Sequence, residues 1–333
     1  MSIGELCGVR LAGTGSAVPP RILHNRDLER MVDTSDEWIL QRTGIRERRI
    51  CDPRSEGTFT LGRDAMARAL EDAGRKGSDL DLIICGTCTS EMPCPSTACR
   101  ISAAVGAAPA GAFDLTAACC GFVYSMNVAD SLIRSGRFRR IGVVGVDAMS
   151  TAIDYNDRSV SILFGDAAGA AVLERDDDPG KGCIYQRMHA DGNGWGSLYI
   201  PRREQEVPEE DRDNPIRLGH LRMNGREVFK FAVTRFRETV EDAIAGTGLT
   251  VDEISQFVCH QSNLRIIEAA REKIGIPHEK MPVNIDRFGN SSAGSVGLLF
   301  DQLRKGGKCR PGETVMLVAF GGGMTWASGV WRL

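Results

Sequence analysis

The chain has 333 residues, of which 42% are hydrophobic and 26% are charged, and its formal net charge is −3. This length provides for two domain-sized units or one large α/β body, and the small net charge gives no basic field that would attract nucleic acid. No apolar run approaches the roughly 18 residues that span a bilayer, so we predict no membrane-spanning segment and expect no membrane partner.

The N-terminal region predicts a strand and no targeting signal. Residues 1–6 lack the charged segment and apolar core of a secretory signal, so we expect a cytoplasmic protein in which the eleven cysteines stay reduced. Residues 9–16 are typical of a strand that enters a glycine-rich turn. Val18 stands where a dinucleotide fingerprint needs its third glycine, and prolines follow, so the sequence excludes a nucleotide site here.

Residues 38–50 combine one tryptophan with four arginines. A run of charges is usually a solvated face of a helix. Tryptophan and arginine together are also the side chains that stack on and neutralise a phosphorylated adenine. The spacing alone slightly favours the solvated face.

Four cysteines gather in the next region, at 85, 88, 94 and 99. The Cys85-x-x-Cys88 spacing invites a metal or thioredoxin-like hypothesis. These cysteines straddle the end of a buried strand (80–87), a proline-containing loop and a helix, without a second close pair or a histidine. We therefore predict no metal site.

The stretch from Ala112 to Phe122 is the most informative part of the chain. An apolar run of strand character leads through a turn of small residues into an amphipathic helix over 122–130, which leaves Cys119 at the helix N-terminus. Unpaired N–H groups and the helix dipole favour a thiolate there. The alternative is a buried structural cysteine, which is the more common fate of a lone cysteine.

The second half of the chain repeats the first. After a charged segment over 202–220, which predicts an exposed loop, and a helix over 228–244, the pattern of 79–85 returns at 252–259. We expect an α/β protein of two pseudo-repeated halves, 1–174 and 175–333, with mainly parallel sheets. Ligand sites in such sheets lie at the carboxyl ends of strands.

Two further residues fall at such strand ends. His260 follows the apolar strand 257–259, and Asn290 lies in a turn at the position that the repeat equates with Cys119. Singly, they are typical of a core histidine and a turn asparagine. Together they favour acyl chemistry, in which a thiolate attacks a carbonyl while imidazole and carboxamide stabilise an oxyanion. The glycine run 321–323 fits an oxyanion hole built from backbone N–H groups.

With these residues in place, the sequence resembles β-ketoacyl-acyl carrier protein synthase III of the thiolase superfamily over nearly its whole length. The resemblance implies a five-layered αβαβα thiolase-like fold, a homodimer, and condensation of an acyl-CoA primer with malonyl-acyl carrier protein with release of CO2. The matching motifs are Asp33 to Trp38, Arg42 to Arg48, Phe113-Asp114, Ala117 to Phe122, Phe164 to Asp166, His260 to Arg265, Asp286 to Ser292 and Gly321 to Trp326.

The resemblance also implies individual roles. Cys119 would carry the acyl group, His260 and Asn290 would activate the malonyl thioester, and the backbone N–H groups of Cys119 and Gly322 would form the oxyanion hole. No cofactor is implied, since the CoA thioester is a substrate. The residues implied in binding are Trp38, Arg42 and Arg158 for CoA, and Lys230 and Arg265 for docking of the acyl carrier protein.

Two positions depart from the family pattern. Cys120 stands where a small residue without a thiol is usual, and Cys94 stands where many members carry an aromatic that closes the acyl pocket of the partner subunit. The segment 202–220 also looks longer than usual. A papain-like protease uses cysteine, histidine and asparagine in the same order, but its cysteine signature is missing. A related acyltransferase or condensing enzyme of a specialised-metabolite pathway stays open.

Overall fold

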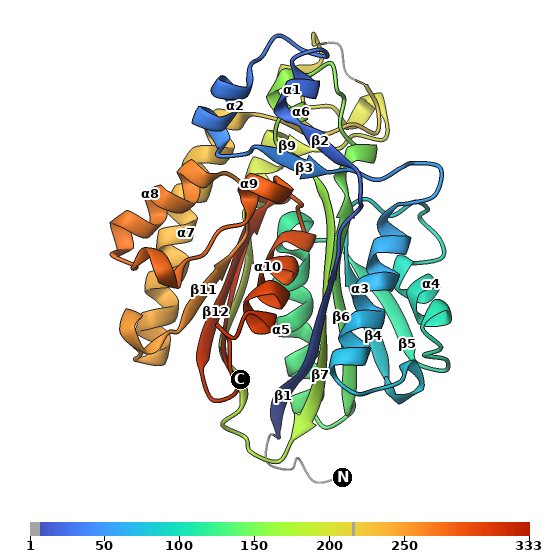
Figure 1. Ribbon diagram of the computed structural model, residues 1–333, viewed down its shortest axis with the longest axis vertical. Coiled ribbons are helices and arrows are strands. Elements are labelled where there is room, and N and C mark those ends of the chain that lie inside the picture. The colour runs from blue at the N-terminus through green and yellow to red at the C-terminus, as the bar shows by residue number, and fades with distance from the viewer. Residues whose placement is uncertain (1–6, 215–216) are drawn as a thin grey trace.

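The chain is described by a computed structural model over residues 7–214 and 217–333 (Figure 1). Residues 1–6, on which the expectation of no secretory signal rests, and residues 215–216 of the charged loop lie outside the described residues. No helix of the described part is long and apolar enough to cross a membrane.

Two main sheets stand side by side, with helices between them and on both outer faces (Figure 1). This arrangement confirms the predicted five layers. The central layer is α5 (Gly121–Arg134) and α10 (Gly294–Lys305); the outer layers are α3 (Thr58–Asp72) with α4 (Thr97–Ala104), and α7 (Gly225–Thr247) with α8 (Leu264–Ile274).

The first sheet has the strand order β1-β7-β6-β4-β5, and the second has the order β8-β13-β12-β11. From β1 to β4, and again from β8 to β11, successive pairs are antiparallel, antiparallel and parallel. The two halves therefore share one topology. The strands are β1 (Gly8–Ala17), β4 (Leu82–Gly86), β5 (Gly111–Leu115), β6 (Arg140–Ala148), β7 (Asp166–Asp176), β8 (Gly182–Ala190), β11 (Gln256–Cys259), β12 (Thr314–Gly321) and β13 (Thr325–Arg332).

The prediction of mainly parallel sheets is wrong, because both sheets are mixed. Strands covered by helices on both faces are largely apolar whether they run parallel or antiparallel to their neighbours. Both β7 and β13 are largely buried, so their sequences did not indicate that they run antiparallel. The division between 174 and 175 stays a prediction; β7 itself continues to Asp176.

Short elements gather at one end of the molecule, above the carboxyl ends of β4 and β6 (Figure 1). Among them, β9 and β10 pair with each other, and so do β2 and β3. They are β2 (Ile22–His24), α1 (Asn25–Leu28), α2 (Asp36–Thr43), β3 (Glu47–Arg49), α6 (Arg158–Ser161), β9 (Leu198–Tyr199), β10 (Arg222–Met223) and α9 (Ile285–Phe288).

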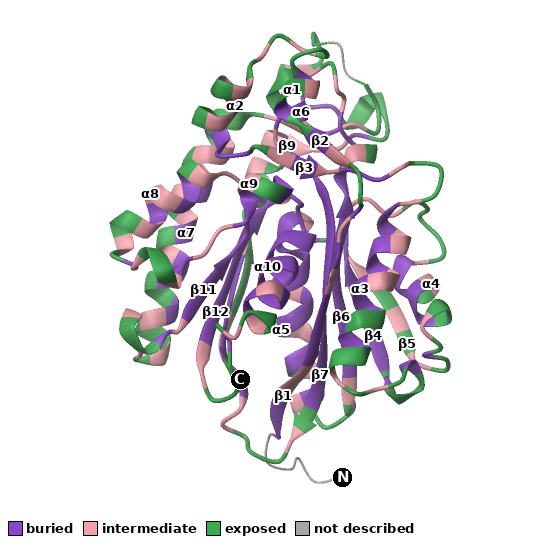
Figure 2. Ribbon diagram, viewed as in Figure 1, coloured by how far each residue is buried: buried purple, intermediate pink, exposed green. Residues whose placement is uncertain are grey.

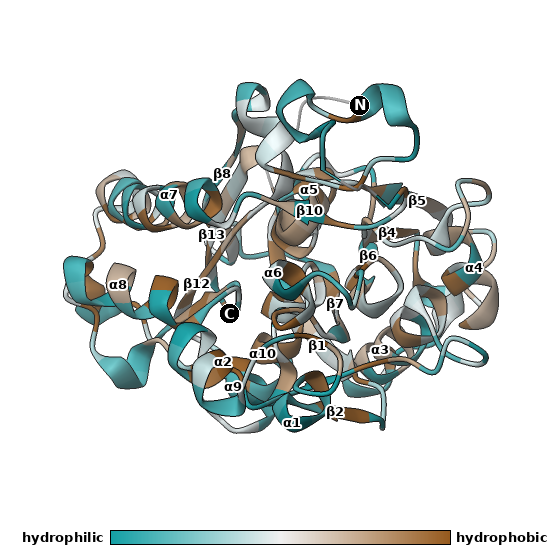
Figure 3. Cartoon of the chain, turned by 90° about the horizontal axis from the view of Figure 1, so that it is seen from above, coloured by the Kyte–Doolittle hydropathy of each residue, from teal (hydrophilic) through white to brown (hydrophobic). Residues whose placement is uncertain are grey.

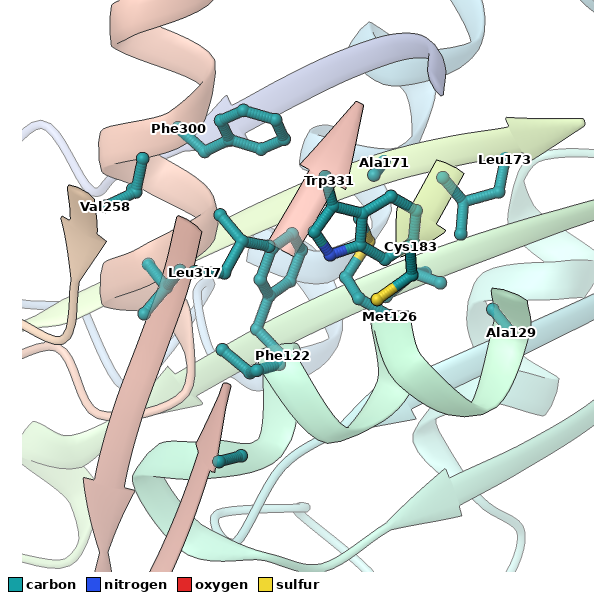
Figure 4. Packing of buried hydrophobic residues seen from close by; sticks show 14 of the residues in the cluster. Phe122, Met126, Ala129, Ala171, Leu173, Cys183, Val258, Phe300, Leu317 and Trp331 are labelled. Carbon is teal, nitrogen blue, oxygen red and sulfur yellow. The ribbon is translucent and has the colours of Figure 1, made fainter. Parts of the chain in front are cut away.

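The core lies on either side of the central helices. Apart from β5 and most of β8, buried residues fill the strands of the two sheets and the two central helices, while exposed residues follow the outer helices and loops (Figure 2). Seen from above, hydrophobic residues likewise follow the central strands and hydrophilic ones the periphery (Figure 3). In α5, Phe122, Met126 and Ala129 recur at helical spacing and pack with Leu317 and Trp331 of the second sheet (Figure 4). Each large side chain buried in this way stabilises the fold by about 1.5–3 kcal/mol.

The start of α5 is held directly against β4. A Cβ atom on Gly86 would lie 2.4 Å from the carbonyl carbon of Gly121, so only glycine lets the helix approach the strand this closely. This contact fixes the first turn of α5, and with it the residues just before the helix.

Candidate active site

Cys119 lies in a tight turn between a strand and the central helix. Strand β5 ends at Leu115, and Cys119 belongs to a 3-10 turn that runs directly into α5, so it follows the strand by four residues and does not end it. Ala118 has a positive φ of 45°, as sharp turns require. A Cβ on Gly321 would lie 2.8 Å from the Cys119 nitrogen, so the glycine run allows β12 to approach the cysteine.

Two opposing effects set the pKa of the Cys119 thiol: burial and hydrogen bonding. Burial raises its pKa to about 11, while the Ser292 hydroxyl and the N–H groups of Cys119 and Gly322 hydrogen-bond the sulfur and lower the pKa in part. Burial has the larger effect, so the resting group is a thiol and the helix terminus does not by itself make a thiolate. The same two N–H groups form a small donor pocket beside the sulfur.

Cys120 is chemically distinct from its neighbour. It is fully buried in the apolar cluster of α5, and burial raises the pKa of its thiol far above the usual range. Cys119 lines two cavities and Cys120 lines neither of them. The structure therefore leaves Cys119 as the accessible thiol of the pair.

His260 follows directly after β11, as its sequence predicts. Its N–H donates to Val318 on the neighbouring strand at 2.8 Å, and its ring packs edge-on against Phe320 with centroids 5.4 Å apart. Its Nδ1 lies 2.6 Å from the Ser295 hydroxyl. Burial lowers the pKa of the imidazole to about 3, so His260 is neutral at pH 7.

Asn290 lies in the turn after α9, and its backbone is fixed by the segment before β7. Its N–H donates to Leu163 at 2.9 Å, and its carbonyl accepts from Gly165 at 3.0 Å. The side-chain oxygen accepts the N–H of Ser292 at 2.9 Å, which assigns the amide orientation. The amide nitrogen has no partner among the hydrogen bonds of the described residues and is available as a donor.

Two cavities meet at Cys119. The narrow cavity has a volume of about 90 Å³ and is lined by Cys119, His260 and Asn290. None of the described residues that line it has a carboxylate side chain. The wide one has a volume of about 700 Å³ and reaches the surface. Its polar rim includes Glu56, Glu91 and Arg202. The structure thus brings the three residues singled out from distant parts of the sequence into one site.

The charged segment 202–220 contributes to the wide cavity. Most of it is exposed, as predicted, but Arg202, Gly219 and the following Leu221 line the cavity wall, and Val207 is buried. The segment contains two 3-10 turns, Glu204–Glu206 and Glu209–Asp211. The description as a simple exposed loop is therefore incomplete.

Several polar residues that build the site were not predicted from the sequence. Asp147 is fully buried at the end of β6; it accepts hydrogen bonds from Cys88 and Thr89 on one side and from Ala293 on the other. It therefore ties the loop after β4 to the turn that carries Asn290. A lone carboxylate after the apolar run 141–146 was the available signal. No sequence signal marked Ser292 or Ser295, since serine is ordinary both in a turn and in the first turn of a helix.

The three residues expected to bind CoA lie together near the surface. The Arg158 guanidinium lies 5.1 Å from the centroid of the Trp38 ring, and that of Arg42 lies 5.7 Å from it. Arg158 also donates to the Asp33 carbonyl at 2.8 Å. Trp38 and Arg42 are placed by α2, whose N-cap Ser35 accepts the N–H of Trp38.

The remaining predicted positions lie outside the two cavities. Lys230 on α7 and Arg265 on α8 are exposed, and neither forms an ion pair within the described residues. Cys94 is exposed in the loop between β4 and α4 and lines neither cavity of its own chain. All eleven cysteines are free thiols, and the described residues contain no cluster of three or more side chains that could hold a metal ion.

Comparisons with known proteins agree with this geometry. Family models of 3-oxoacyl-[acyl-carrier-protein] synthase III and of its C-terminal part match residues 113–192 and 244–333. The β-ketoacyl-[acyl-carrier-protein] synthase III of Caldanaerobacter subterraneus is 44% identical over 98% of both chains. That of Escherichia coli (strain K12) is 43% identical over 97% of this chain and 99% of the relative.

Solved structures give the same result. The 3-oxoacyl-[acyl-carrier-protein] synthase III of Aquifex aeolicus VF5 superposes with a TM-score of 0.90 at 40% identity, covering 98% of this chain and 100% of that one. The priming β-ketosynthase from the R1128 polyketide biosynthetic pathway superposes with a TM-score of 0.91 at 35% identity, covering 100% and 98%.

The layered mixed sheets, with a buried thiol where two cavities meet, place the chain among the thiolase-like condensing enzymes, which are acyltransferases. Within that class, the chain belongs to the β-ketoacyl-[acyl-carrier-protein] synthase III family.

Proposed function

We propose that this protein condenses an acyl-CoA primer with malonyl-acyl carrier protein to give a 3-oxoacyl-acyl carrier protein and CO2, the condensation that initiates fatty-acid biosynthesis. Membership of the family supports the reaction. The observation that carries it to this chain is the position of Cys119, which borders a wide cavity on one side and shares a narrow one with His260 and Asn290 on the other.

In the first half-reaction, Cys119 takes the acyl group from CoA. Its sulfur attacks the thioester carbonyl and loses its proton as the CoA thiol leaves. The N–H groups of Cys119 and Gly322, which already point at this sulfur, would stabilise the oxyanion. The wide cavity gives the acyl chain room to extend from the sulfur.

In the second half-reaction, His260 and Asn290 hold the malonyl thioester. A neutral imidazole and a free amide nitrogen are both hydrogen-bond donors, so they stabilise the enolate that forms when CO2 leaves. The resulting carbanion attacks the Cys119 thioester. No carboxylate base lines the narrow cavity among the described residues, and decarboxylation needs none to create the carbanion.

Exposed arginine and lysine side chains indicate where CoA and the acyl carrier protein would bind. Trp38 and Arg158 would sandwich the CoA adenine, with Arg42 beside them, since a guanidinium already lies over the ring. Lys230 and Arg265 would dock the acidic acyl carrier protein, because both are exposed cations near the narrow cavity, which the adjacent Phe229 lines. The CoA thioester is a substrate, and no cofactor is proposed.

We propose that the protein forms a homodimer and acts in the cytoplasm. Strand β5 is paired only with β4 in the described part of the chain, and its Phe113 is 39% exposed, so this edge offers unpaired backbone groups and an apolar side chain to a further strand. Pairing of β5 with its copy would cover this edge. The family resemblance implies that the Cys94 loop of one protomer then reaches the acyl pocket of the other.

One assay tests the proposal directly. Purified protein is incubated with a panel of acyl-CoAs and malonyl-acyl carrier protein, and products are read by mass spectrometry. A 3-oxoacyl-acyl carrier protein is the expected product; acyl transfer without loss of CO2 would overturn the assignment. A second candidate function is condensation in a specialised-metabolite pathway, and the likeness to the R1128 priming β-ketosynthase is the observation that supports it. Preference for a carrier protein other than that of fatty-acid synthesis would support it.

A further inference from the structure

Ser295 is the closest polar contact of the His260 ring. It is the second residue of α10, it is 1% exposed, and its hydroxyl oxygen lies 2.6 Å from His260 Nδ1. The two residues are 35 positions apart in the chain and meet only because α10 packs beside the end of β11. The contact is short enough to be a strong hydrogen bond.

The direction of this hydrogen bond follows from the other partner of Ser295. The N–H of Gln261 donates to the same hydroxyl oxygen at 3.4 Å. If His260 carried its proton on Nδ1, the oxygen would accept two N–H groups and its own hydrogen would have no acceptor in a buried site. The hydroxyl makes no other hydrogen bond within residues 7–214 and 217–333, and buried donors are seldom left unpaired.

We propose that Ser295 is a positioning residue that donates its hydroxyl hydrogen to His260 Nδ1 and so holds the proton of the neutral ring on Nε2. Imidazole has one donor and one acceptor when neutral, so this bond decides which nitrogen can donate to a substrate. The inference rests on the role proposed above for His260, which needs a donor facing the narrow cavity.

The position of Ser295 is set by the core. A Cβ on Gly294 would lie 2.2 Å from the carbonyl oxygen of Ala167, so the first residue of α10 is held against β7. The N–H of Ser295 donates to the Ser292 carbonyl at 3.2 Å. On the other side, Phe320 packs against the imidazole. The hydroxyl is thus held by helix α10, and the ring packs against strand β12.

The tautomer is measured first, on the unmodified protein. Histidine is labelled with ¹⁵N at both ring nitrogens, and the resonances of His260 are assigned among the five histidines by comparison with His260→Ala. We expect the Nε2–H tautomer at pH 7. Observation of the Nδ1–H tautomer would overturn the proposal, whatever the activity of the enzyme.

The consequence is measured on variants. Ser295→Ala should mix the two tautomers and slow decarboxylation of malonyl-acyl carrier protein by roughly 10- to 100-fold, by analogy with the loss of the partner that fixes the tautomer of a metal-ligating imidazole. Acylation of Cys119 by acyl-CoA should stay unchanged. Ser295→Thr keeps the hydroxyl and should restore both the tautomer and the rate.

A matched control separates this effect from general loss of packing. Ser125 is fully buried in helix α5, and its hydroxyl has no hydrogen-bond partner within the described residues, so Ser125→Ala deletes a buried hydroxyl without breaking a bond. Its decarboxylation rate should equal that of the wild type. Wild-type decarboxylation and an unchanged tautomer in Ser295→Ala would overturn the proposal. Unimpaired decarboxylation in His260→Ala would instead refute the role proposed for His260.

Discussion

The hydroxyl of Ser292 donates a hydrogen bond to the sulfur of Cys119, with 3.4 Å between oxygen and sulfur. Ser292 holds a positive φ of 48°, and its N–H is bound by the Asn290 side chain at 2.9 Å. A backbone conformation that costs free energy in a non-glycine residue is therefore retained where it places a donor on the candidate nucleophile.

Removal of this donor should make Cys119 less reactive. The bond favours the thiolate, so Ser292→Ala should raise the pKa of Cys119 and move the pH dependence of its alkylation to higher pH. A hydrogen bond to a charged group is worth about 1.5–3 kcal/mol, and a more basic thiolate is more nucleophilic, so alkylation at neutral pH should slow about three- to tenfold. Rates of iodoacetamide labelling mapped to Cys119 measure this. An unchanged pH profile would show that the contact does not act on the thiolate.

Acylation should occur on Cys119 and not on Cys120. Of these two cysteines, Cys119 borders the cavities and Cys120 does not, and burial raises the pKa of the Cys120 thiol far above its usual range. Peptide mapping after incubation with acyl-CoA should find the thioester on Cys119. Cys119→Ala should lose acylation, while Cys120→Ala, the matched control, should keep it. A thioester on Cys120 would refute the assignment.

His260→Ala and Asn290→Ala should separate the two half-reactions. Both side chains are proposed to donate hydrogen bonds to the malonyl thioester when CO2 leaves. Loss of one such oxyanion donor typically lowers the rate about 10²- to 10³-fold. Decarboxylation of malonyl-acyl carrier protein should fall by that factor, while acyl transfer to Cys119 stays largely intact. Each rate is measured separately, by CO2 release and by mass of the acylated protein. A variant that decarboxylates but does not self-acylate would contradict the proposed roles.

Cys94 should set the preferred length of the primer in a dimer. An aromatic at this position of the partner subunit would fill part of the acyl cavity, whereas the smaller cysteine leaves room in a space of about 700 Å³. Each buried CH2 contributes about 0.8 kcal/mol, so primers longer than butyryl should be accepted, as a shifted preference and not an absolute one.

The comparison of kcat/KM for acetyl-, butyryl-, octanoyl- and dodecanoyl-CoA in the wild type and in Cys94→Phe tests this. The variant should lose the longer primers selectively. Cys99→Phe serves as a control, since Cys99 is also exposed and lines neither cavity. A wild type restricted to acetyl-CoA, or the same profile in both proteins, would contradict the prediction.

The sequence by itself indicated the α/β class, many of the strands and helices, and the three residues proposed for catalysis. Local patterns carry this information: alternation of apolar runs and helical spacing marks strands and helices, and His260 follows its strand directly. The motifs around Cys119 and Asn290 were sufficient to indicate the family. These signals survive in a single sequence because each lies within a few neighbouring residues.

Only the tertiary structure decided how these parts meet. The antiparallel direction of β7 and β13 was hidden because strands buried on both faces have the same apolar composition in either direction. The contacts of Ser292 with Cys119 and of Ser295 with His260 join residues 173 and 35 positions apart. Such contacts depend on how helices pack between the sheets, and no local propensity of a serine specifies which distant atom its hydroxyl will reach.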